Sequence, residues 1–235
     1  MRKISFLAVA LCLCIGALHA DVLFQLGNNS QPGEVSVVAN SAQTGTTVTG
    51  NINGLPGVGV NFTSTQTLLI SSVGPAQVSG CAAPCVGPSF TASPINNMSF
   101  SLTSPEPGIS GYGDLIIDPH IEDGCDTCGG GTATVTVTAL TKGGVLEPPA
   151  TFQYALSSGS NFLTITTTGG ERILSTTIKD SADFSDVRSV SLSGIATGIT
   201  GVPEPSTYAP LLALALGAFA LLRRRSRKGV SNTLL

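Results

Sequence analysis

The chain has 235 residues, only 11% of them charged, and it contains no tryptophan. Residues 21–201 hold 13 of the 14 acidic residues but only four of the 11 basic ones, so this segment carries a net charge of −9. Such a segment lacks the basic footprint that nucleic-acid binding needs, and we therefore exclude nucleic acid as a partner. The low charge and the many Gly, Ser and Thr residues indicate one exported all-β domain.

The first 20 residues predict a secretory signal peptide. Arg2 and Lys3 form a basic start, and residues 4–18 follow as an apolar stretch without a charge. This order is typical of a secretory signal. Cleavage after Ala20 would leave a mature domain that begins at Asp21. An uncleaved N-terminal anchor is the alternative interpretation.

Residues 21–201 contain short runs rich in β-branched and aromatic residues, separated by Gly, Pro and Asn. The clearest run is 132–140, where threonine occupies every second position and apolar residues lie between. This period of two gives a strand with one hydroxyl face and one apolar face. The strands that we expect are 35–39, 58–62, 68–73, 98–102, 112–117, 132–140, 151–156, 162–167, 172–178 and 187–192.

About ten short strands without a helical period predict an antiparallel β-sandwich of jelly-roll type. We expect this domain, residues 21–201, to lie between an N-terminal signal helix at 1–20 and a C-terminal transmembrane helix. The transmembrane helix belongs to a sorting and anchor segment at 202–228, and residues 229–235 form a short extension.

Four cysteines remain after the signal segment: Cys81, Cys85, Cys125 and Cys128. In an exported protein these predict disulfides. We expect local pairing, of the first with the second and of the third with the fourth, because each pair flanks a tight loop that contains Pro or Gly. The same spacing also permits a zinc site with four thiolate ligands, which is the alternative.

Five carboxylates lie within thirteen residues: Asp114, Asp118, Glu122, Asp123 and Asp126. With the glycines nearby, they predict an acidic, turn-rich loop. Calcium binds several oxygen ligands, so Ca²⁺ is the candidate cofactor, although the spacing differs from an EF-hand loop. The alternative is a solvated acidic loop without a metal. His120 lies within the same stretch and is interpreted as a loop residue.

The sequence shows no catalytic constellation. His120 is the only histidine beyond the signal segment, and no G-x-S-x-G motif is present. We therefore expect a protein that is not an enzyme. A glycosidase with two carboxylates is the alternative, since two acids at the right separation cannot be seen in a sequence. Sugar sites usually carry aromatic platforms, however, and the domain has only Tyr112 and Tyr154 and no tryptophan.

The C-terminal segment has three parts in a fixed order. Pro203, Glu204 and Pro205 form a short box that the prolines keep extended. An uncharged stretch rich in Leu and Ala follows at 209–222, about 21 Å long as a helix, and snorkelling of the basic side chains brings it close to a minimal membrane span. Arg223, Arg224 and Arg225 begin a basic run that the positive-inside rule places on the cytoplasmic side.

This three-part order resembles the PEP-CTERM sorting signal of exported bacterial proteins. The resemblance implies that Pro203, Glu204 and Pro205 form the recognition box, that 209–222 is a transient anchor, and that Arg223, Arg224 and Arg225 form the membrane stop. It also implies that the membrane enzyme exosortase processes the tail. A second Pro-Glu-Pro, at 105–107, lacks both the apolar stretch and the basic run.

The resemblance implies a route as well as a signal. The partners would be the secretion translocon and exosortase, and the protein would pass through the inner membrane to the cell surface or extracellular matrix. An association with extracellular polysaccharide is further implied. We therefore expect a non-enzymatic structural or binding protein of exopolysaccharide or biofilm. The alternatives are a carbohydrate-active enzyme and a surface adhesin, which would show a large exposed apolar patch.

Overall fold

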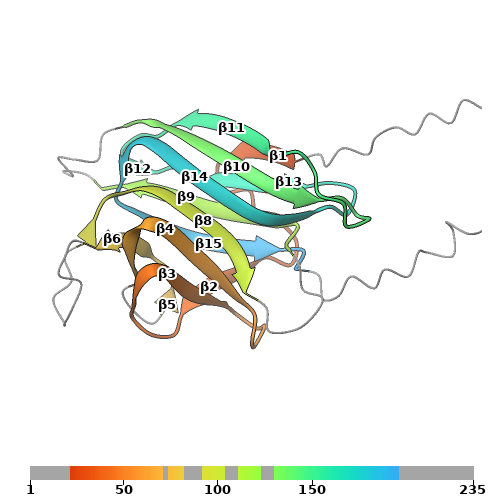
Figure 1. Ribbon diagram of the computed structural model, residues 1–235, viewed down its shortest axis with the longest axis horizontal. Coiled ribbons are helices and arrows are strands. Elements are labelled where there is room, and N and C mark those ends of the chain that lie inside the picture. The colour runs from red at the N-terminus through yellow and green to blue at the C-terminus, as the bar shows by residue number, and fades with distance from the viewer. Residues whose placement is uncertain (1–21, 71–73, 82–91, 104–110, 123–129, 196–235) are drawn as a thin grey trace, which may run out of the picture. The chain divides into compact units, whose positions relative to one another are not determined.

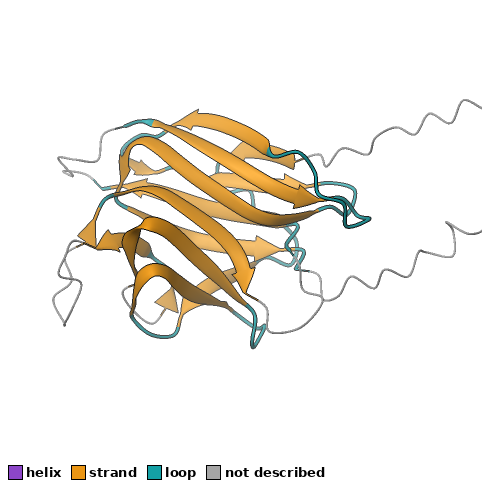
Figure 2. Cartoon of the chain, viewed as in Figure 1, coloured by secondary structure: helices purple, strands orange, loops and turns teal. Residues whose placement is uncertain are grey.

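The computed structural model describes residues 22–70, 74–81, 92–103, 111–122 and 130–195, all within one unit that spans Met1–Ile199. All regular secondary structure in these ranges is β-strand, as Figure 2 shows. The strands are β1 (Val22–Leu26), β2 (Val35–Ala39), β3 (Gln43–Ile52), β4 (Gly59–Ile70), β5 (Gly74–Pro75), β6 (Val78–Cys81), β7 (Ala92–Ser93), β8 (Ile95–Thr103), β9 (Asp114–Ile121), β10 (Thr132–Leu140), β11 (Ala150–Ala155), β12 (Gly159–Ser160), β13 (Leu163–Thr167), β14 (Arg172–Phe184) and β15 (Asp186–Ser193).

One hydrogen-bonded network joins these strands, and the pairs along it are antiparallel. Its order is β1-β13-β9-β15-β2-β3-β4-β8-β14-β10-β11. Strand β6 pairs with β15 on one side and with β4 on the other, so β15, β2, β3, β4 and β6 form a closed ring of strands. In Figure 1, strands β11, β10, β14, β8 and β4 cross the front, and β13, β9 and β15 lie behind them.

The prediction of an all-β antiparallel domain is confirmed. A sandwich, however, implies two separate sheets, whereas here the sheet folds over and closes on itself through β6. The predicted signal helix at 1–20 and the predicted transmembrane helix lie outside the described residues. Within the described ranges, no helix is long and apolar enough to cross a membrane.

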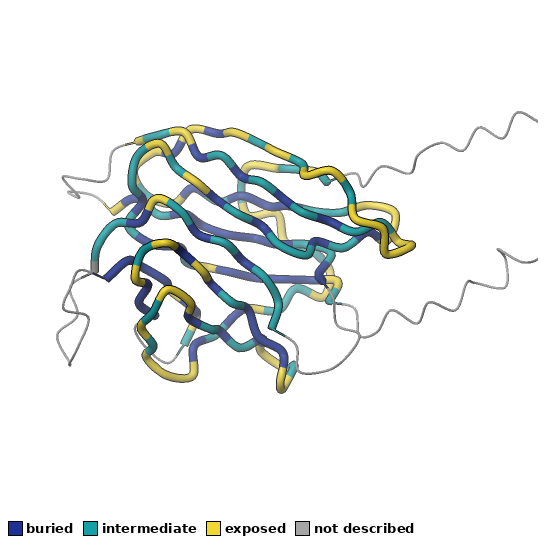
Figure 3. Tube along the Cα trace, in the orientation of Figure 1, coloured by how far each residue is buried: buried dark blue, intermediate teal, exposed yellow. Residues whose placement is uncertain are grey.

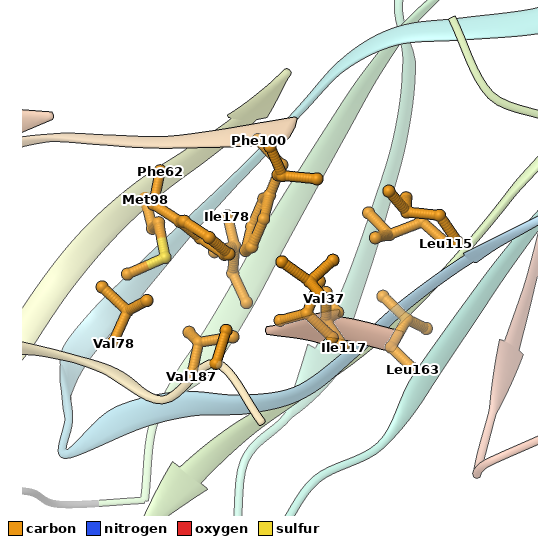
Figure 4. Close-up of a cluster of buried hydrophobic side chains, with 14 of the residues drawn as sticks. Val37, Phe62, Val78, Met98, Phe100, Leu115, Ile117, Leu163, Ile178 and Val187 are labelled. Atoms are coloured by element: carbon orange, nitrogen blue, oxygen red, sulfur yellow. The ribbon is translucent and has the colours of Figure 1, made fainter. Parts of the chain in front are cut away.

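Side chains from the front and the back of the fold meet in one hydrophobic core. Figure 4 shows this cluster, in which β4 and β8 contribute Phe62 and Phe100, and β9 and β13 contribute Ile117 and Leu163. The rings of Phe62 and Phe100 meet edge to face, with centroids 5.6 Å apart. Buried and exposed residues alternate along the strands, as Figure 3 shows for the front layer. This alternation follows from the pleat, which turns successive side chains to opposite faces.

The expected strands differ from the observed ones mainly where a strand contains many polar residues. The runs at 35–39 and 132–140 match β2 and β10, whereas 58–62 and 68–73 join into the single strand β4. Strand β3 was not expected because it is built of Thr, Gly and Asn with few apolar residues. Its Gly50 faces the core, and a Cβ there would overlap Val37 Cγ1 of β2, so the close strand packing requires glycine. Strands β1, β5, β6, β7 and β12 were also not expected.

Candidate functional site

A row of hydroxyl side chains crosses six neighbouring strands on the outer surface of the sheet. The register places Thr47 of β3, Thr63 of β4, Ser99 of β8, Thr177 of β14, Thr136 of β10 and Thr151 of β11 next to one another in this order. We call these six residues the hydroxyl row. At about 4.8 Å between strands, five steps make the row about 24 Å long.

A second row runs beside the first and consists of Thr49, Asn61, Ser101, Ser175 and Thr138. We call the two rows together the hydroxyl face. Hydrogen bonds join neighbours within it: Thr47 and Thr63 at 3.2 Å, Thr49 and Asn61 at 2.9 Å, and Ser99 and Thr177 at 2.8 Å. A hydroxyl can donate one hydrogen bond and accept two, so these paired hydroxyls keep capacity for a ligand.

The hydroxyl face carries no charge in either of its rows, although the domain as a whole is strongly acidic. The nearest charges in the register lie one row away on either side: Lys179, between Asn97 and Thr134, and Arg172, which pairs with Leu140. Strands in a sheet rotate by roughly 20–25° from one to the next, so a row across six strands winds instead of lying flat. The face therefore suits a neutral polymer that can follow a twisted surface.

A separate cavity lies where the two edge strands, β1 and β11, approach each other. Its volume is about 280 Å³, at the small end of the range for ligand pockets, and it is lined by Leu26, Gly27, Tyr154, Ala155, Ser160, Asn161 and Phe162.

 A second cavity, of about 340 Å³, is lined by Gly33, Val35, Asn53, Gly54, Leu55, Ser193, Gly194 and Ile195. We call the cavity between β1 and β11 the seam cavity.

Stacked aromatic rings connect the two edge strands beside the seam cavity. Phe24 of β1 stacks on Phe152 of β11 with ring centroids 5.1 Å apart, and Phe152 stacks on Tyr154 at 5.9 Å. Strands β1 and β11 are the two ends of the strand order and do not pair with each other. The aromatic side chains therefore join the edges where backbone hydrogen bonds do not.

Tyr154 and Asp180 bring oxygen atoms into the interior. The Tyr154 hydroxyl and both Asp180 carboxylate oxygens are buried without a well-aligned hydrogen bond, although the backbone N–H groups of Ala182 and Ser181 lie near the Asp180 carboxylate. Burial raises the pKa of Tyr154, and the negative charges of Asp118 and Asp180 raise it further. Burial also raises the pKa of Asp180, although the nearby backbone amides of Ala182 and Ser181 lower it in part.

The sheet register explains how these groups meet. Ala133 of β10 pairs with Asp180 on one side and with Tyr154 on the other. Its methyl group is small, so it leaves room between the two larger side chains. Gly131 contributes as well, because a Cβ at this position would lie 2.5 Å from Asp180 Oδ1.

Asp118 approaches from strand β9 and is hydrogen-bonded to Asn161, which lies between β12 and β13. It is 1% exposed, and its Oδ1 accepts a hydrogen bond from the Asn161 backbone N–H at 2.7 Å. The Asn161 side chain in turn donates to the carbonyls of Pro119, Ser157 and Gly159. Asp118 therefore supplies negative charge from a fixed position.

The structure separates the carboxylates that the sequence grouped as a calcium loop. Asp114 and Asp118 lie in strand β9, not in the expected loop, and four residues of extended strand place their Cα atoms about 13 Å apart. The Asp114 carboxylate accepts a hydrogen bond from the Ser193 hydroxyl instead. Glu122 follows β9 directly, and Asp123 and Asp126 lie outside the described residues.

No group of three or more His, Cys, Asp or Glu side chains suited to a metal is found among the described residues. A calcium site that uses Asp123 and Asp126 therefore stays a prediction. His120 is also placed in β9, where its Nδ1 is buried without a hydrogen-bond partner, so its interpretation as a loop residue is wrong. Pro119 precedes His120 and acidic residues follow it in the sequence, so the local sequence gave little indication of a strand here.

Of the four candidate disulfide cysteines, the structure describes Cys81. It ends strand β6, pairs with Ala92 of β7 and is 8% exposed. Cys85, Cys125 and Cys128 lie outside the described residues, so the disulfide pairing stays a prediction.

Large exposed apolar side chains are few in the part of the chain that the structure describes. They are Leu23 and Leu26 of β1 and Val145 and Leu146 of the β10–β11 connection. The adhesin alternative needs a large contiguous apolar patch, and two separate pairs of residues give it little support.

Comparison with known proteins identifies the C-terminal segment. A PEP-CTERM protein-sorting motif matches residues 201–228, which include Pro203, Glu204 and Pro205 and the arginines 223, 224 and 225, all of them outside the described residues. No curated protein and no solved structure matches the chain. The motif is that of an exported protein sorted by exosortase, and the predicted resemblance is confirmed.

Proposed function

We propose that this protein is a non-enzymatic component of the cell surface or extracellular matrix that binds neutral polysaccharide through the hydroxyl face. The sorting motif at residues 201–228 supports the export and the handling by exosortase. The translocon as the export partner, the disulfides and the polysaccharide are part of the proposal. The observation that carries the binding role is the uncharged hydroxyl row across six strands.

The hydroxyl row complements a chain of sugars in chemistry and in length. Sugar hydroxyls donate and accept hydrogen bonds, as Ser and Thr do, so each can pair with the other without a charged partner. The row is about 24 Å long, so several consecutive sugar units can contact it. An acidic polysaccharide would instead meet repulsion from the net charge of −9 on residues 21–201.

Each contact on this face contributes little by itself. A hydrogen bond to an exposed hydroxyl replaces one to water, so its net contribution is about 0.5–1.5 kcal/mol. A polymer makes several such contacts together, and neighbouring protein molecules bound to one polymer add avidity. We therefore expect weak binding to short oligosaccharides and retention by long ones.

The enzymatic alternative needs two carboxylates that face an open cleft. Asp118 and Asp180 both lie near Tyr154, but Asp118 is 1% exposed and already accepts a hydrogen bond from Asn161. This arrangement does not offer two open carboxylates, which supports the non-enzymatic proposal.

Replacing two hydroxyls of the row tests the binding role. Thr63→Val and Thr177→Val keep the side-chain shape and the preference for strand while removing the hydroxyl. We expect each to weaken retention on an immobilised neutral polysaccharide by about 2- to 10-fold. The matched control is Thr166→Val, on β13 behind the front layer. Equal retention of all three variants and the unchanged protein would refute the role of the hydroxyl row.

Mass measurement of the exported protein tests whether exosortase processes the tail. The chain is expressed in hosts with and without exosortase, and the surface material is analysed for the tail. Replacing Pro203, Glu204 and Pro205 with alanine should leave the tail in place in the competent host. Surface material from that host that still contains Arg223, Arg224 and Arg225 would count against processing.

A further inference from the structure

We propose that Val145 and Leu146, in the connection between β10 and β11, enter the surface of the lipid bilayer to which the sorting tail anchors this protein. We call these two residues the loop tip. The inference rests on the anchoring part of the proposed function and does not depend on polysaccharide binding. The partner is the phospholipid bilayer itself, on the side of the membrane to which the domain is exported.

The loop tip exposes two large apolar side chains next to each other. Val145 is 65% exposed and Leu146 is 62% exposed, and the preceding residues 142–144 are exposed as well. Figure 3 shows exposed turns, in yellow, at this end of the fold. Exposed apolar side chains that are scattered singly need no partner, so exposure alone does not decide the matter. The position of the loop tip in the fold supplies the further evidence.

Both ends of the described domain lie at one end of the fold. Val22, at the start of β1, pairs with Thr167. The Thr167 N–H donates to the Gly113 carbonyl at 2.9 Å, and the Gly113 N–H donates to the carbonyl of Ser193, the last residue of β15, also at 2.9 Å. The segments before residue 22 and after residue 195 therefore attach to the domain at the same end.

The loop tip belongs to this end too. Leu146 forms a bridge with Leu140, which ends β10 and pairs with Arg172 at the start of β14. The next residue of β14, Ile173, bridges Tyr112, which directly precedes the glycine that contacts β15. Figure 1 shows the β10–β11 connection and the end of β15 on the same side of the view. The sorting tail follows β15, so the tether attaches at the end of the domain that carries the loop tip.

Exposed apolar side chains concentrate at this end. Among the described residues four large ones are exposed, and three of them lie here: Leu23, near the start of β1, and the two residues of the loop tip. The fourth, Leu26, is at the other end of β1. This distribution gives the end beside the tether a more apolar surface than the opposite end.

The backbone of the turn is suited to a medium without water. The Gly144 N–H donates to the Thr141 carbonyl at 2.8 Å, and the Thr141 N–H donates to the Val145 carbonyl at 2.9 Å. The Val145 N–H donates to the Thr141 hydroxyl at 3.1 Å. Residues 148 and 149 are prolines, which have no N–H to satisfy. Because these polar groups are paired within the turn, the loop tip can leave water without exposing unpaired donors to lipid.

The charge of the connection favours apolar contact over attraction to charged lipid. Residues 141–149 hold one cation, Lys142, and one anion, Glu147, so the connection has no net charge. Recognition of anionic lipid requires a cluster of about four to eight basic residues. The long side chain of a lysine can instead keep its ammonium among the head groups while neighbouring apolar residues lie deeper. The contact should therefore persist at high salt.

The contact is weak by itself and depends on the anchor. A single myristoyl chain gives only marginal membrane binding, and two short side chains bury less apolar surface than such a chain. While the tail is in the membrane, it keeps the loop tip at a high effective concentration beside the bilayer. The contact then holds the end of the domain that leads to the sorting box near the membrane surface, and removal of the tail releases it.

Tryptophan fluorescence of the full chain in vesicles tests the inference. The chain contains no tryptophan, so a single introduced one reports from a single site. The protein is purified with its tail from a host without exosortase and reconstituted into phosphatidylcholine vesicles, with or without bromine on the acyl chains. We expect brominated lipid to quench the emission of Leu146→Trp, at low and at high salt.

Ser158→Trp is the matched control. Ser158 is also exposed, and it lies in the connection that follows β11, at the other end of that strand from the loop tip. Tryptophan itself favours the membrane interface, and both variants carry this bias equally. Brominated lipid should leave the emission of Ser158→Trp unchanged. A second reporter, Val145→Trp, should be quenched, and adding Leu146→Ser to it should lower the quenching. A melting transition shows that each variant folds.

Flotation with the vesicles measures anchoring, whereas quenching measures the contact of the loop tip. A chain that does not float would overturn the anchoring and this inference together. A chain that floats, but in which Leu146→Trp is quenched no more than Ser158→Trp, would overturn the contact of the loop tip alone. Emission that moves to shorter wavelength without quenching by brominated lipid would indicate contact between protein copies and would also overturn it. Loss of quenching at high salt would contradict apolar insertion.

Discussion

Replacing Asp180 with asparagine should stabilise the protein in the absence of any ligand. Both carboxylate oxygens are buried without a well-aligned hydrogen bond, Asp183 adds like charge, and the backbone amides of Ala182 and Ser181 offset only part of this. Asparagine keeps the shape but removes the charge. A buried unsatisfied polar group costs about 1–3 kcal/mol. Because Asp180 is only half-buried, water screens part of this cost, and we expect a gain of about 1 kcal/mol, or about 2–4 °C in Tm.

The pH dependence of this gain follows from the raised pKa of Asp180. The folded protein holds the Asp180 proton more tightly than the unfolded chain does. The free energy of unfolding therefore falls as the pH rises from the ordinary aspartate pKa, about 3.9, through the raised value. Below this window the carboxyl is protonated in both states and the penalty is absent.

Urea unfolding across this pH range measures the effect. The difference in stability between Asp180→Asn and the unchanged protein should grow with pH through the window and then stay constant. Asp183→Asn should give a smaller gain, because its oxygens are not among the buried unpartnered atoms. A variant that is less stable at neutral pH, or a gain that does not vary with pH, would refute the reasoning.

Three further substitutions test the packing of the sheet, each by denaturant unfolding. Gly50→Ala should cost about 1–3 kcal/mol, since the added methyl overlaps Val37; unchanged stability would show that β2 and β3 can separate. Tyr112→Phe should cost about 1–2 kcal/mol because it removes the hydroxyl that bonds the buried Thr176 at 3.1 Å, and a neutral result would mean that this bond contributes little. Asp186→Asn should cost about 2 kcal/mol, as it weakens a paired guanidinium contact at 2.6 Å, and a gain in stability would contradict this.

Alternating patterns predicted the strands whose two faces differ most in polarity. In 132–140, threonine and apolar residues alternate without a break, and β10 has the same bounds. Strand β3 escaped prediction because Gly50 replaces an apolar residue on its buried face. The long strand β4 was divided in two because every residue of its middle, 63–67, is polar. The apolar environment of such a strand comes from its neighbouring strands and not from its own sequence.

Site residues were predicted less well, because a sequence gives types and not pairings. The threonines of 132–140 indicated one hydroxyl strand, but the register across five further strands was needed to form the hydroxyl row. The acidic run suggested a single calcium loop, whereas β9 separates Asp114 from Asp118 by extended backbone. Asp180 and Tyr154 gave no signal, since they are 26 residues apart and meet only across Ala133.

The sequence by itself determined the destination of this protein and the class of its fold. A sorting signal is recognised as a linear segment, so the order of its box, apolar stretch and basic run at 201–228 is sufficient. Strand periodicity is likewise local, because the pleat repeats every two residues. The tertiary structure alone decided which strands are neighbours, and with them the hydroxyl face, the closed ring through β6 and the partly buried position of Asp180. Those features depend on hydrogen bonds and burial between segments far apart in the chain, which no local pattern encodes.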